Sequence, residues 1–69
     1  MKATLMLADN SFMVTVRPLG LSVIEGGALK LKEDFLQKMA SAVAEERGGT
    51  LIRAWCTHDG VYAEIEVEG

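Results

Sequence analysis

The most regular pattern along the chain is an apolar residue at every fourth position between residues 31 and 43. The four positions are Leu31, Phe35, Met39 and Val43, with Leu36 and Ala42 beside them. Residues spaced by three or four lie on one side of an α-helix, so this pattern predicts an amphipathic helix over about 31–47. The Gly48-Gly49 pair that follows is typical of a helix end.

Residues 50–68 alternate in character on both sides of Asp59-Gly60, which is typical of a β-hairpin with a two-residue turn. In this register Trp55 lies opposite Glu64, and Cys56 lies opposite Ala63. One face carries small and aliphatic side chains that suit packing under the helix: Ile52, Ala54, Cys56, Ala63, Ile65 and Val67. The other face carries Arg53, Trp55, Thr57, Tyr62, Glu64, Glu66 and Glu68.

The first part of the chain also alternates, and it is predicted to form a hairpin over residues 2–17. Asp9 and Asn10 form its turn, because both residue types tolerate the positive φ of a tight turn. This register places Met6 and Met13 opposite each other on the mixed, outward face of the sheet.

Residues 19–31 allow two interpretations. In the first, a second hairpin over about 21–31 turns at Glu25-Gly26-Gly27; in the second, the helix already begins near Leu29. A structureless stretch of this length is unusual in a small domain, which favours the hairpin. In that hairpin the apolar side chains share one face: Leu21, Val23, Leu29 and Leu31.

Together these elements predict a two-layer α+β fold that forms a single domain over residues 1–69. The amphipathic helix packs on the aliphatic side of the antiparallel hairpins. The order of strands between hairpins leaves no mark in the pattern of residues.

Charge and composition narrow the classes of function. Ten acidic residues against seven basic ones give a net charge of −3, and the basic residues are scattered along the chain. Because phosphate binding needs clustered positive charge, we expect no nucleic-acid partner. No apolar run approaches the ~18 residues of a membrane span, and Cys56 is the single cysteine. We therefore expect a soluble, acidic, cytoplasmic protein with no membrane partner.

The outer face of the last hairpin, with the two methionines, is the leading candidate for a binding surface. Aromatic residues beside an arginine are typical of interface centres, although such pairs also stabilise an ordinary sheet. We predict a small regulatory interaction module, without enzymatic activity or cofactor, that forms a homodimer or binds another protein. The predicted partner-binding residues are Met6, Met13, Arg53, Trp55, Tyr62, Glu64, Glu66 and Glu68.

Two other interpretations stay open. The alternating Glu64, Glu66 and Glu68 form an acidic stripe, which suits an inhibitor or adaptor that binds a basic site on another protein. Cys56 and His58 point to the same side of their predicted strand, which suits a small-molecule binder or an enzyme. No second Cys or His completes a set of metal ligands, and neither glycine pair has the spacing of a phosphate-binding loop.

Overall fold

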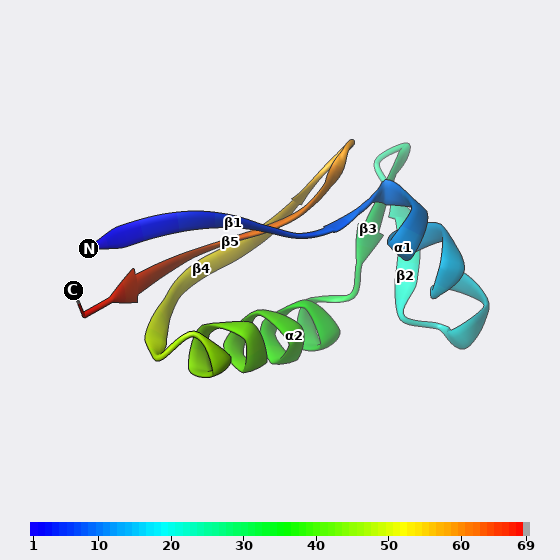
Figure 1. The fold of residues 1–69 in the computed structure, drawn as a ribbon. Helices are drawn as coiled ribbons and strands as arrows, with labels where there is room; N and C mark the ends of the chain where they lie inside the picture. The colour runs from blue at the N-terminus through cyan, green and yellow to red at the C-terminus, as the bar shows by residue number, and fades with distance from the viewer. Residues whose placement is uncertain (69) are drawn as a thin grey trace.

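A three-stranded antiparallel sheet with one long helix on one face forms the main body of the protein. The computed structural model describes residues 1–68, and its sheet has the order β1 (Lys2–Asp9), β5 (Gly60–Val67) and β4 (Gly49–Thr57). Helix α2 (Glu33–Glu46) lies under the sheet and packs mainly against β4 (Figure 1). The predicted α+β class is confirmed.

The remaining elements form a cap at one end of the sheet. They are helix α1 (Asn10–Thr15), the 3₁₀ turn η1 (Arg17–Leu19), and the two-stranded β2 (Ser22–Glu25) and β3 (Ala28–Leu31) (Figure 1). The molecule is therefore elongated, with extents of 38 × 19 × 17 Å. Its radius of gyration is 12.2 Å, against about 11 Å for a compact domain of this length.

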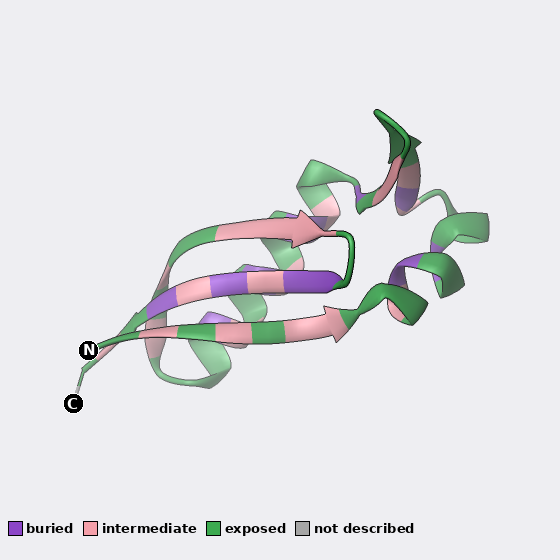
Figure 2. Ribbon diagram, turned by 90° about the horizontal axis from the view of Figure 1, so that it is seen from above, coloured by how far each residue is buried: buried purple, intermediate pink, exposed green. Residues whose placement is uncertain are grey.

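Strand β5 lies in the middle of the sheet, and buried and half-buried residues alternate along most of it (Figure 2). Val61, Ala63 and Ile65 point toward the helix and are buried. On the helix, Ala40 and Ala44 are buried, and their small side chains let the helix approach the sheet closely. This alternation leaves the opposite face, called the outer face below, without a covering helix in residues 1–68.

The core of the cap joins it to the main sheet. Buried residues from four elements meet there: Met13, Val16, Leu31, Leu36 and Val61. The rings of Phe12 and Phe35 stack beside this cluster with centroids 6.2 Å apart. The cap is thus held by side-chain packing between elements that are distant in sequence.

The predicted hairpin over residues 2–17 is wrong. Its first half is strand β1, which pairs with β5, and the chain turns into helix α1 at Asn10. Asp9 is the N-cap of that helix, because its carboxylate accepts a hydrogen bond from the backbone N–H of Ser11 at 3.1 Å. An Asp-Asn pair suits a helix start as well as a turn, so the two structures compete for the same signal.

The hairpin predicted over about 21–31 is confirmed as the pair β2 and β3, with a different register. Gly26 and Gly27 both have positive φ (58° and 80°) and form a two-residue loop instead of the predicted three-residue one. Leu29 therefore lies opposite Ile24, and Leu31 lies opposite Ser22. Val23 is on the other face, so the predicted apolar face loses one member.

The last hairpin is also confirmed, although its register is shifted by two residues. The turn is His58-Asp59, and Gly60 is already the first residue of β5, opposite Thr57. A Cβ at Gly60 would lie 2.6 Å from the carbonyl oxygen of Ala8, so only glycine allows β1 to approach there. This even shift keeps the side chains of residues 53–57 and 61–67 on their predicted faces.

Helix α2 is confirmed, and it starts two residues later and ends one residue earlier than predicted. Its most buried residues differ from those of the predicted apolar stripe. Leu36, Ala40 and Ala44 are buried, whereas Phe35 and Met39 of the predicted stripe are half-buried. In β4, a bulge between Leu51 and Arg53 also changes which side chains face the helix. There Leu51 lies opposite Ile65, and Ile52, predicted for the helix-facing side, is exposed.

Alanine substitutions at two methionines test which residues belong to the core and which to the surface. Met13 has no exposed surface and Met6 is 54% exposed, so Met13→Ala leaves a cavity in the core and Met6→Ala does not. We expect Met13→Ala to lower the free energy of unfolding by about 2–5 kcal/mol. Met6→Ala is expected to change it by about 0.5 kcal/mol or less. Urea denaturation at low protein concentration measures both, and equal losses would contradict the placement of Met13.

Candidate protein interface on the outer sheet face

The pairing of the three strands arranges the outer face in rows of three side chains. The central row is Met6, Tyr62 and Trp55. On the side toward the chain ends lie the row Thr4, Glu64 and Arg53 and then the row Lys2, Glu66 and Thr50. On the other side lies the row Asp9, Gly60 and Thr57. These rows define the outer face, and six of the eight predicted partner-binding residues belong to them.

The side chains of Arg53, Trp55 and Tyr62 form a stacked cluster. The rings of Trp55 and Tyr62 lie 6.0 Å apart at an angle of 18°, and the guanidinium carbon of Arg53 lies 4.3 Å from the Trp55 ring centroid. Arg53 Nε also donates a hydrogen bond to Glu64 Oε1 at 3.2 Å. Each side chain restricts its neighbour, so the cluster is ordered without a ligand.

The turn between β4 and β5 extends this cluster with a fixed carboxylate. Thr57 donates its hydroxyl proton to Asp59 Oδ1, and the Tyr62 hydroxyl donates to Asp59 Oδ2 at 3.2 Å. The hydrogen bond from Thr57 is the main cause that lowers the pKa of Asp59 below its ordinary value of 3.8. Loss of surrounding water raises the pKa of Tyr62 above 10.0, and the bond to Asp59 raises it further.

An open hollow of about 410 Å³ lies over this end of the outer face. It is lined by Thr4, Trp55, Thr57, His58, Asp59 and Tyr62. The predictions did not include Thr4 and Thr57 as site residues and explained Asp59 by its turn alone. Thr4, Thr57 and Asp59 are brought to this hollow by the register of the three strands. That register depends on the close approach of β1 at Gly60, which the residue pattern does not reveal.

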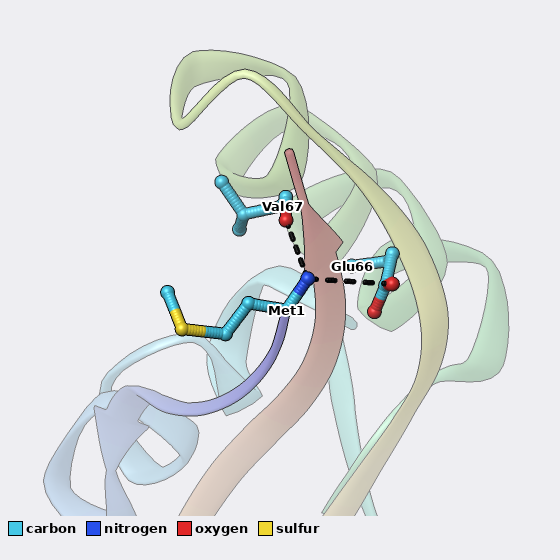
Figure 3. Close-up of polar contacts among 3 residues, drawn as sticks. All are labelled: Met1, Glu66 and Val67. Atoms are coloured by element: carbon cyan, nitrogen blue, oxygen red, sulfur yellow. Dashed lines mark hydrogen bonds and ion pairs between the residues drawn. The ribbon is translucent and has the colours of Figure 1, made fainter. Parts of the chain in front are cut away.

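The predicted acidic stripe is partly neutralised. Glu64 is paired with Arg53, and Glu66 lies 3.4 Å from the amino group of Met1, which also donates to the Val67 carbonyl at 2.7 Å (Figure 3). Glu68 is exposed just beyond the end of β5. Two of the three carboxylates therefore already have a cationic neighbour within the chain.

The two methionines of the predicted surface are separated. Met6 lies on the outer face beside Tyr62, whereas Met13 lies in the core on helix α1. The prediction that Met13 lies on the outer face is wrong, because residues 10–15 fold as a helix and not as the second strand of a hairpin.

Cys56 and His58 do not line the same space. Cys56 is half-buried and lines a groove of about 420 Å³ with Leu31 and Leu36, while His58 lies in the turn and lines the hollow on the outer face. The shifted register takes His58 out of the strand, and so the expected pairing on one side of the strand is wrong. Among residues 1–68, no group of three or more His, Cys, Asp or Glu side chains is placed to hold a metal ion.

No family model, curated protein or solved structure matches this chain. In the described part of the chain, no helix is long and apolar enough to cross a membrane.

The link between Asp59 and Tyr62 is testable because Tyr62 is the single tyrosine. We expect Asp59→Asn to move the Tyr62 pKa down toward 10.0, because the variant removes the negative charge that opposes tyrosinate. The shift is partial, since the loss of surrounding water remains. Because the pKa of Tyr62 is higher in the folded state, protonated Tyr62 stabilises the fold below pH 10. This stabilisation is lost as the pH rises through the pKa of Tyr62 in the folded protein. Tyrosinate absorbance against pH measures the shift, and an unchanged titration would exclude the link.

Proposed function

We propose that this protein is a non-enzymatic interaction module that associates with a second copy of itself through the outer face. The observation that carries the proposal is the ordered cluster of Arg53, Trp55 and Tyr62, beside the exposed Met6, on a sheet face that no helix of residues 1–68 covers (Figure 2). An uncovered apolar centre with a polar border is typical of protein-binding surfaces.

The composition and the order of the cluster both support binding. Trp, Tyr and Arg are the residue types that most often dominate interface energies. Stacking on Trp55 and the bond to Glu64 already restrict the Arg53 side chain, although it is 65% exposed. Side chains that are ordered before binding lose less conformational entropy when a partner arrives.

The edges of the sheet are less suited to association than its face. Both edge strands are irregular: β1 has a bulge between Met6 and Ala8, and β4 has one between Leu51 and Arg53. Bulges interrupt the regular row of backbone donors and acceptors that a further strand would need. We therefore place the contact on the face of the sheet.

The charges of the face favour a second copy as the partner. The face carries Lys2 and Arg53 as well as Glu64 and Glu66, so it offers both signs of charge to an identical surface. Three strands of eight or nine residues cover about 14 by 26 Å. This projected area of about 360 Å² per copy is less than half of the ~800 Å² per partner of a standard interface, so we expect a weak dimer that dissociates on dilution.

Three alanine variants test the proposal, with sedimentation velocity over a dilution series as the measurement. Truncating a central aromatic residue of an interface lowers the free energy of binding by about 2 kcal/mol or more. In a symmetric dimer each substitution is present twice, so the loss is counted twice. We expect Trp55→Ala to raise the dissociation constant of the dimer about 100-fold or more, and Met6→Ala to raise it about ten-fold.

Ile24→Ala is the matched control, because Ile24 is 55% exposed, as Met6 is, but lies on β2 away from the outer face. It is expected to leave the dissociation constant within about two-fold of the wild-type value. A wild-type protein that is monomeric throughout, or equal effects of all three variants, would refute self-association through this face.

A further inference from the structure

A symmetric dimer joined through the outer face can be built in two ways, which the charges distinguish. Two stacked sheets are related by a two-fold axis that lies between them, either along the strands or across them. Both axes can pass through the row of Met6, Tyr62 and Trp55, so both bury the same aromatic cluster. They differ in which charged rows meet.

An axis along the strands brings identical rows together. It exchanges β1 and β4, and it leaves each residue of the central strand facing itself. Glu64 would then lie over Glu64 of the second copy, and Glu66 would lie over Glu66 of the second copy. Like charges that meet within an interface are strongly unfavourable.

An axis across the strands reverses the order of rows. Glu64 then lies over Gly60 of the second copy, which has no side chain and leaves room for the carboxylate. Arg53 lies over Thr57 of the second copy, whose hydroxyl is bonded to Asp59. Glu64 and Glu66 no longer meet their own copies, and Arg53 meets the turn that carries Asp59 on both sides of the axis.

We infer that two copies stack with their strands antiparallel about this crosswise axis, and that Arg53 of each copy pairs with Asp59 of the other. The inference rests on the proposed function and adds to it the arrangement of the partner. The Arg53 guanidinium has five N–H donors, of which one is used in the bond to Glu64, and so it has donors for a second carboxylate. Asp59 is exposed, and Thr57 and Tyr62 fix its orientation.

Mixing two charge-reversal variants tests this pairing. Arg53→Glu places two acids together at each contact, and Asp59→Lys places two cations together, so each variant alone is expected to dimerise about ten-fold or more weakly. In an equimolar mixture, Glu at position 53 meets Lys at position 59, and the native Arg53 meets the native Asp59. The mixture is therefore expected to form a heterodimer with nearly wild-type affinity.

Lys38→Glu on helix α2 is the matched charge reversal away from the outer face, and it should leave association unchanged. If the mixture stays monomeric while the wild type dimerises and Trp55→Ala does not, the crosswise arrangement is overturned and the proposed function stands. If the wild type is monomeric at every concentration, the proposed function itself fails.

A distance measurement tests the same point without altering the charged contact. A spin label on Glu66→Cys, in a Cys56→Ala background, lies four residues from the axis along β5. The crosswise arrangement places the two labelled Cα atoms about 29 Å apart, whereas the lengthwise one places them about 10 Å apart. Electron paramagnetic resonance separates these values, and the short distance would overturn the inference.

Discussion

The pairing of strand β5 with neighbours on both sides fixes most of what this protein presents to its surroundings. Because both edges of β5 are hydrogen-bonded, its side chains alternate strictly between the helix-facing side and the outer face. Val61, Ala63 and Ile65 supply the buried side, and Tyr62 and Glu64 supply the other. A slip of one residue would exchange the two sets, so the core and the candidate interface depend on the same register.

That register also explains why the surface cluster is ordered. Directly paired positions bring Trp55 against Tyr62 and Arg53 against Glu64, and the turn then directs Asp59 toward the Tyr62 hydroxyl. Within residues 1–68 the sheet is covered by α2 on one face only, and the cap extends the molecule instead of covering the other face (Figure 1). The proposed self-association would bury the face that this arrangement leaves open.

Local signals account for the elements that were predicted and for those that were not. Helix α2 and the last hairpin carry strong periodicity, and both are present. Residues 10–16 fit two structures: Phe12, Val14 and Val16 fit an alternating strand, while Phe12, Met13 and Val16 fit one side of a helix equally well. The helix lets Met13 join the buried cluster that includes Val61, a long-range arrangement that no local pattern records. The outer-face residues of the last hairpin were predicted, since the error in register was an even number.

The central claim, that the outer face is where the protein binds itself, is tested most directly by the fluorescence of Trp55, the single tryptophan. A soluble quencher such as iodide or acrylamide reports how much of the indole ring is open to solvent at each protein concentration. We expect quenching to be weak in concentrated solution and to increase on dilution, as the dimer dissociates and exposes Trp55. Strong quenching that is the same at every concentration would contradict the account.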